Sequence, residues 1–360
     1  MSLSCGLVGL SSAGKTVIFR AITAARVVSC SGSGMNRLVI NVLDKRLDRL
    51  AAMYRPRKVV PATLEIVDIP GLRARPQSNG NGFRLLGHVK NVDALLHVVR
   101  CFEDSNVAFE YDTIDPMRDV ETVDLELMAA DSATLENRIH SLAKKVRAGD
   151  KDAICQTADC EKVRAGIDRG IPARKQDLTA RELASIRDCN LVSLKPVLYV
   201  GNIKTVRDAD TRHVAALKRI ADDEHTEMLL VCGKDEADIA DLPPDEQADF
   251  MRELGLSRSS MERLTLAAYQ LLGFVTFFTT GEDEVRAWTC HRGDKAAVAA
   301  GKIHSDMEKG FIRMEVIRYD DLVELGSEAA VAKAGRQRVE SRDYEVQDGD
   351  TVCVLFNRRG

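Results

Sequence analysis

Residues 9–16 read GLSSAGKT, and this stretch decides the fold. It matches the pattern G-x-x-x-x-G-K-[ST], in which backbone amides and a lysine surround the phosphates of a nucleoside triphosphate. The apolar run 3–10, which ends in the first two residues of the motif, predicts a strand, and the periodic segment 17–24 after the motif predicts a helix. The motif requires this strand–loop–helix context, so a chance glycine-rich loop is the less favoured interpretation.

The chemistry of the loop assigns roles to its residues. Lys15 would give a positive charge to the β- and γ-phosphates, and the start of the following helix would add its positive dipole end. The Thr16 hydroxyl can complete a magnesium shell. The predicted nucleotide-binding residues of the loop are Gly9, Ser11, Ser12, Ala13, Gly14, Lys15, Thr16 and Val17.

A second motif, D-x-x-G at residues 68–71, follows the β-branched run 62–67. Asp68 is predicted to orient Mg²⁺, and the Gly71 N–H is predicted to meet the γ-phosphate. The motif is weak alone, but its place at a strand end after a phosphate loop favours a Walker B and switch II site over a solvated turn. We therefore predict Lys15, Asp68 and Gly71 as catalytic residues and Thr16 and Asp68 as magnesium ligands.

The residue after Gly71 is Leu72, where many translation-type GTPases place a Gln or His that orients the attacking water. A leucine side chain makes no hydrogen bond. We therefore expect slow hydrolysis, with the water positioned by backbone groups, another residue or a partner.

Further apolar runs predict the rest of the architecture. Strand-like runs at 94–99, 196–200 and 228–231 alternate with helical or turn material, which predicts an α/β fold with a parallel, doubly wound sheet. Between residues 120 and 188, apolar residues recur at helical spacing on a charged background, with a turn at Gly149-Asp150. This predicts an inserted antiparallel helical hairpin, with two ordinary surface helices as the alternative. After Gly273 the sequence predicts a small β-rich domain.

Composition limits the classes of partner. The chain has 360 residues, a formal net charge of -4 and nine cysteines with no C-x-x-C pair. We expect no global attraction to DNA or to a membrane, no zinc ribbon and a cytoplasmic protein with reduced thiols. The basic clusters 55–58 and 144–147 can contact RNA phosphates, although solvated surface is the more ordinary interpretation of either alone.

The base site is predicted after the strand 196–200, at residues 201–205 (GNIKT). A guanine-specific enzyme would show N-K-x-D here, with an Asp that accepts hydrogen bonds from guanine N1 and N2. Asn202 is present and can address a purine, but Thr205 stands where the carboxylate would be. Without that carboxylate the site loses much of its reason to prefer guanine.

At this point the whole chain resembles the YchF/Obg-like ATPase family. The resemblance is carried by phrases in one order along the chain: 44–50 (DKRLDRL), 60–63 (VPAT) leading into 68–72 (DIPGL), 96–104 (LHVVRCFED), 194–200 (LKPVLYV), 284–289 (EVRAWT), 301–306 (GKIHSD), 310–313 (GFIR) and 319–329 (YDDLVELGSEA). So many matches in the same order along the chain are specific to this family.

The resemblance implies a P-loop G domain at 1–118 and 190–275, a helical coiled-coil insertion at 119–189 and a C-terminal TGS domain of β-grasp fold at 276–360. It implies Mg²⁺-dependent ATP hydrolysis favoured over GTP, and association with the ribosome, for which we expect the large subunit. It also implies that Phe102 lines the base pocket and that the loop at Cys232 and Gly233 closes over the base. With Asn202 and Ile203, these complete the predicted nucleotide-binding residues.

The sequence departs from the family in two places. The base-binding motif of the family is N-x-x-E, and this chain has Thr205 in place of the Glu. Residues 27–36 (VVSCSGSGMN) stand where the family carries its usual switch I sequence. Our hypothesis is a monomeric ATPase that hydrolyses ATP to ADP and phosphate as a slow switch. Two alternatives stay open, a GTPase of the Obg class and a ribosome-binding adaptor that nucleotide only stabilises.

Overall fold

A computed structural model describes residues 4–31, 36–70, 87, 89–107, 109–240, 242–243, 246–247 and 260–357. The chain forms two compact units, one of Met1–Ile40 with Glu65–Leu264 and one of Asn41–Leu64 with Thr265–Gly360. The grouping of Asn41–Leu64 with the C-terminal part is a feature that sequence patterns did not predict. The finer domain boundaries at residues 118, 189 and 275 stay a prediction.

The first unit is built on a seven-stranded sheet in the order β2-β3-β5-β1-β6-β7-β8. Its central strands pair in parallel, as predicted, and β2 adds an antiparallel edge against β3. The strands β1, β6 and β7 are buried along their whole length, which is why they appear in the sequence as continuous apolar runs. The strands are β1 (Ser4–Val8), β2 (Val27–Ser31), β3 (Arg37–Asn41), β5 (Thr63–Asp68), β6 (Ala94–Arg100), β7 (Val197–Asn202) and β8 (Met228–Val231).

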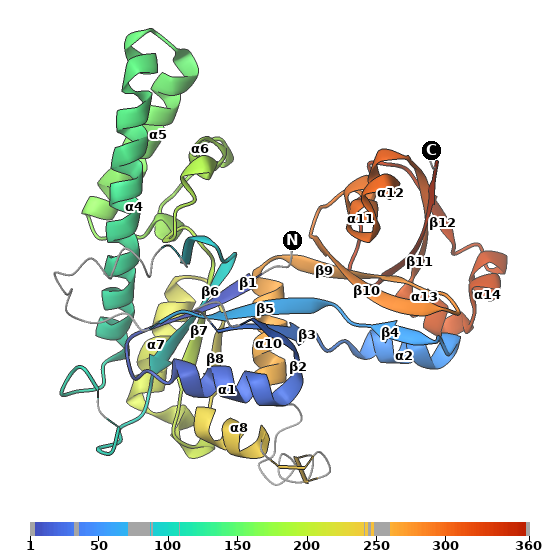
Figure 1. Ribbon diagram of the computed structural model, residues 1–360, viewed down its shortest axis with the longest axis horizontal. Coiled ribbons are helices and arrows are strands. Elements are labelled where there is room, and N and C mark those ends of the chain that lie inside the picture. Colours follow the sequence, from blue (N-terminus) through green and yellow to red (C-terminus); the bar gives the residue numbers. More distant parts are fainter. Residues whose placement is uncertain are drawn as a thin grey trace. The chain divides into compact units, whose positions relative to one another are not determined.

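Helices connect these strands, as the alternating pattern predicted (Figure 1). Helix α1 packs beside α8, and α4 packs against α7. Their bounds are α1 (Lys15–Arg26), α7 (Arg212–Asp223), α8 (Gly233–Ala240) and α10 (Ser260–Leu271), with the short 3-10 helix η3 (Val206–Asp210) before α7. The carboxyl ends of β1, β5, β6 and β7 thereby meet at one edge of the sheet, where a phosphate loop is expected.

The predicted helical hairpin is present (Figure 1). Helices α4 (Pro116–Arg147) and α5 (Lys151–Asp168) lie side by side and are joined at Gly149, whose φ of 80° is a left-handed conformation that suits glycine. Asp150 then caps α5 by accepting hydrogen bonds from two backbone amides. A short helix, α6 (Ala180–Ile186), packs on α5 and was not predicted.

Buried charges hold the hairpin against the neighbouring segments of the first unit. Arg174, in the 3-10 helix η1 (Ala173–Lys175), lies 2.7 Å from an Asp124 carboxylate oxygen and 3.0 Å from a Glu224 carboxylate oxygen, with all three side chains less than a tenth exposed. Burial alone would raise the pKa of Glu224, but its hydrogen bonds, first that from Arg174, hold this pKa below the usual range. Asp131 is fully buried and accepts the Val192 and Ser193 amides at 2.8 and 2.7 Å.

The second unit is a six-stranded sheet in the order β12-β11-β13-β9-β10-β4. The strands β9 and β10 form an antiparallel hairpin, and the last strand, β13, lies parallel to β9 in the centre, which is the expected β-grasp arrangement. Its elements are α2 (Lys45–Tyr54), β4 (Lys58–Val60), β9 (Phe274–Thr279), β10 (Glu284–His291), α11 (Ala296–Ile303), α12 (Ser305–Lys309), β11 (Phe311–Arg318), α13 (Tyr319–Leu325), α14 (Glu328–Lys333), β12 (Arg338–Glu340) and β13 (Asp350–Phe356).

The early segment joins this unit through specific contacts. Strand β4 extends the sheet by pairing in parallel with β10. Arg46 donates to Asp44 and to Asp348 at 2.7 Å each, so one guanidinium links the start of α2 to the turn before β13. In the described part of the chain, no helix is both long and apolar enough to span a lipid bilayer.

Candidate functional site

The loop between β1 and α1 has the curled backbone that a phosphate site requires. Gly9 has a φ of 145°, and a Cβ atom there would lie 2.3 Å from the Val98 carbonyl oxygen. Ser12 and Gly14 also have positive φ values, 61° and 100°. Positive φ angles at these three positions curl the loop, and a curled loop whose N–H groups face one concave side at a helix start forms an anion-binding nest.

Lys15 is the first residue of α1 and is only 6% exposed. Its Nζ donates hydrogen bonds to the carbonyl oxygens of Gly9 at 2.9 Å and Leu10 at 2.7 Å. Burial lowers the pKa of Lys15 to about 8, against an opposing pull from the charges of Asp68 and Glu110. The loop thus holds a single, weakly solvated cation where phosphate charge would arrive.

Asp68 ends β5 beside the loop. The parallel register pairs it with Leu7 of β1, so both carboxyl ends reach the same edge of the sheet. Burial raises the pKa of Asp68, while the charge of Lys15 and a hydrogen bond with Asn36 oppose the rise. The structure therefore brings the predicted lysine and aspartate together. Gly71, and Leu72 after it, lie outside the described residues.

The donor set for a metal fits magnesium. Thr16 is exposed in the first turn of α1, and Asp68 is partly buried at the end of β5. A hydroxyl and a carboxylate are hard oxygen donors, and Mg²⁺ is usually bound by one or two such side chains together with substrate phosphates and water. Among the described residues there is no cluster of three or more His, Cys, Asp or Glu side chains suited to a metal.

Asn202 joins the phosphate loop to the base side. It is 5% exposed, its Nδ2 donates to the Ala13 carbonyl at 3.0 Å, and its Oδ1 accepts the Gly233 amide at 3.4 Å. A Cβ at Gly14 would lie 2.0 Å from that same Nδ2, so the loop approaches Asn202 as closely as glycine permits. Three loops that are distant in sequence are therefore locked together by one amide.

The predicted base-closing loop lies at the same place. Cys232 donates its thiol to the Lys204 carbonyl at 2.9 Å, and burial raises the pKa of Cys232 to about 12, so the thiol stays neutral. Ile203, next to Asn202, is buried. These contacts fix the chain on both sides of the base-binding segment predicted from the sequence.

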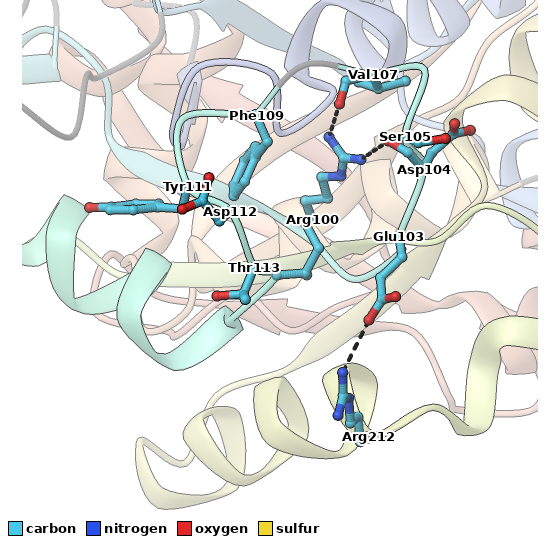
Figure 2. Close-up of a pocket in the computed structure, with 11 residues that line it drawn as sticks. Arg100, Glu103, Asp104, Ser105, Val107, Phe109, Tyr111, Asp112, Thr113 and Arg212 are labelled. Carbon is cyan, nitrogen blue, oxygen red and sulfur yellow. Dashed lines mark hydrogen bonds and ion pairs between the residues drawn. The ribbon is translucent and has the colours of Figure 1, made fainter.

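Phe102 follows β6 and is held by a residue that sequence reasoning missed. The Arg100 guanidinium lies 4.6 Å from the Phe102 ring centroid and donates to the carbonyls of Phe102, Asp104 and Val107 at 3.1, 3.1 and 3.2 Å. Figure 2 shows this buried arginine inside the loop that it braces. The only sequence signal was its place within the phrase LHVVRCFED.

Two pockets flank this loop. One, of about 560 Å³, is lined by Phe102, Lys204 and Asp208 among others. The other, of about 420 Å³, lies around Arg100 and contains an ion pair of 3.1 Å between Glu103 and Arg212 (Figure 2). Only the first contains a residue predicted to contact the base.

Family models match both parts of the chain. A model described as "50S ribosome-binding GTPase" matches residues 4–132. The YchF-GTPase_C model, described as "Protein of unknown function (DUF933)", matches residues 274–357.

Curated proteins and a solved structure are similar over the full length. The chain is 39% identical to a "Ribosome-binding ATPase YchF" of Bacillus subtilis, covering 99% of this chain and 100% of that protein. It is 36% identical to "Obg-like ATPase 1" of rice, covering 99% and 93%. The solved structure of the Schizosaccharomyces pombe YchF GTPase superposes with a TM-score of 0.86 at 30% identity and covers 98% of each chain.

Proposed function

The chain belongs to the YchF/Obg-like ATPase family, and from this premise we propose that it is a slow, Mg²⁺-dependent nucleoside triphosphatase that prefers ATP to GTP. The observation that carries the proposal is the buried Lys15 beside Asp68, at the mouth of a glycine-curled loop that Asn202 ties to the base side. This arrangement supports a triphosphate ligand whose charge is met by one ammonium, backbone amides and a helix N-terminus.

Each predicted site residue has a role in the proposed reaction. Water attacks the γ-phosphorus, the bond from the γ-phosphorus to the β–γ bridging oxygen breaks, and ADP and phosphate leave. Lys15 neutralises charge on the β- and γ-phosphates, and the loop amides orient them. When bound, Mg²⁺ would add Lewis-acid stabilisation of the phosphates, and Thr16 and Asp68 would hold it. The Gly71 amide stays a predicted γ-phosphate contact.

The preference for ATP rests on the base side. Thr205 occupies the place of an acidic base reader, and its hydroxyl donates to Asp208 at 3.1 Å. Residue 205 therefore offers no carboxylate for the paired N1 and N2 donors of guanine, which removes the usual basis for selecting GTP.

We also propose a ribosomal partner, through the large subunit, for a monomer that works in the cytoplasm without DNA or membrane. The curated relatives named above include a ribosome-binding ATPase. In this chain, Lys144, Lys145 and Arg147 are exposed in the last turn of α4, at the end of the hairpin. Such a cluster suits the phosphates of RNA, and binding through it would weaken as salt rises.

The experiment is a paired titration with ATP and GTP in magnesium buffer, followed by phosphate release with each nucleotide. Lys15→Ala should lose binding and hydrolysis. Its matched control is Lys45→Ala, an exposed lysine that also begins a helix, and this variant should behave like the wild type. Unchanged binding and turnover in Lys15→Ala would overturn the proposal, a preference for GTP would favour the Obg-class GTPase, and binding without turnover would favour an adaptor.

A further inference from the structure

The segment after Asn202 contains a carboxylate that the sequence motifs did not assign. Asp208 lies in η3, and its Oδ2 accepts the Thr205 backbone amide at 2.8 Å and the Thr205 hydroxyl at 3.1 Å. The chain therefore folds back so that an acidic group sits beside residue 205, where the motif itself has none. No acidic residue was expected to act here from spacing alone.

Asp208 also faces the pocket on the base side. It lines the 560 Å³ pocket together with Phe102 and Lys204, at the carboxyl ends of β6 and β7. Asn202, two residues before Lys204, is bonded to the phosphate loop. A nucleotide whose phosphates lie in that loop would therefore extend its base toward the segment that carries Asp208.

The two oxygens of Asp208 are not equivalent. Oδ2 is occupied by its two Thr205 donors, whereas Oδ1 accepts no hydrogen bond from the residues that the structure describes. Two cations that line this pocket are already paired, Lys204 with Asp104 at 3.0 Å and Arg212 with Glu103 at 3.1 Å. Asp208 therefore has one carboxylate oxygen, Oδ1, left to accept a hydrogen bond from a base.

A single acceptor distinguishes the two purines at position 6. Adenine presents an amino donor there, whereas guanine presents a carbonyl oxygen that a carboxylate repels. Guanine recognition by an acidic side chain uses both oxygens, against N1 and N2, and one oxygen of Asp208 is already committed. We propose that Asp208 is a specificity-determining residue that accepts a hydrogen bond from the 6-amino group of an adenine nucleotide, an inference that rests on the proposed function.

The test combines changes in the protein and in the ligand. The wild type and Asp208→Ala are titrated with ATP and with purine riboside triphosphate, which lacks the 6-amino group. The wild type should bind ATP about tenfold more tightly than the analogue, and Asp208→Ala should bind the two equally. The control Asp210→Ala removes an exposed acid from the same 3-10 helix and should keep the wild-type ratio.

A second variant protects the test against a folding defect. In Asp208→Asn the amide oxygen should keep the place of Oδ2, because both Thr205 partners are donors, which leaves the NH₂ group toward the pocket. A donor there should weaken ATP binding and strengthen GTP binding, about tenfold in their ratio, with an unchanged unfolding temperature.

The possible outcomes distinguish a failure of the Asp208 inference from a failure of the proposed function. If the wild type prefers ATP and both Asp208 variants keep its nucleotide ratios, this inference is overturned and the proposed function stands. If the wild type binds neither ATP nor GTP, both are overturned. If Asp208→Ala loses affinity for ATP and for purine riboside triphosphate by the same factor, the residue has no part in base selection and the inference is also overturned.

Discussion

The lowered pKa of Lys15 predicts that nucleotide affinity depends on pH. Only the charged ammonium attracts phosphate, so binding should weaken as pH rises through the pKa of about 8 in the free protein. Bound phosphate would raise this pKa again, so the complex keeps its proton. Between about pH 7.5 and 9.5 the charged fraction falls from about three quarters to about 3%, so Kd should rise about 25-fold, or about 1.9 kcal/mol.

A solvated lysine would behave differently. With an ordinary pKa of about 10.4, the same change in pH would alter Kd by only about 1.1-fold. The assay is a fluorescence or calorimetric titration with Mg-ATP at several pH values, with native folding checked at each one. Lys15→Met should bind weakly and without this pH dependence.

A flat profile in the wild type would refute the reasoning. It would mean either that the Lys15 ammonium stays charged to high pH or that it contributes nothing to phosphate binding. An equal pH dependence in Lys15→Met would assign the titration to another group.

Two further predictions concern packing. Arg174→Met should lower the free energy of unfolding by about 3–5 kcal/mol, measured by urea denaturation, because Asp124 would stay buried without its cation and Glu224 would keep only Lys175. A loss below about 1 kcal/mol would show that water reaches the two carboxylates. Gly14→Ala should weaken ATP binding at least about tenfold in the same titration, since a left-handed φ of 100° and a 2.0 Å approach to Asn202 both oppose a side chain; wild-type affinity would mean that the loop relaxes freely.

The sheet and the phosphate loop could be predicted from the sequence because local sequence patterns specify both. Buried parallel strands are continuous apolar runs, and the glycines at 9 and 14 occupy positions that demand unusual backbone angles. The hairpin turn at Gly149 is a local signal of the same kind.

Pairings between distant side chains could not be predicted in this way. Arg46 bonds to Asp348, 302 residues away, and nothing in the periodicity of either segment marks the contact. The inclusion of Asn41–Leu64 in the C-terminal unit depends partly on this pair. Asp208 was missed for a related reason, because motif spacing counts residues along the chain, whereas η3 returns the carboxylate to Thr205.

The contacts of Lys15 and of Asn202 distinguish the phosphate side of the site from the base side. A phosphate that binds near Lys15 competes with the Gly9 and Leu10 carbonyls for the ammonium, so part of its electrostatic gain replaces existing hydrogen bonds. Among the residues that the structure describes, the Asn202 side chain bonds only to backbone groups of neighbouring loops and can keep these contacts when a nucleotide enters. Changes at Lys15 should therefore alter affinity and turnover for every nucleotide alike, whereas changes at Asp208 should alter the ratio between bases and leave the phosphate chemistry intact.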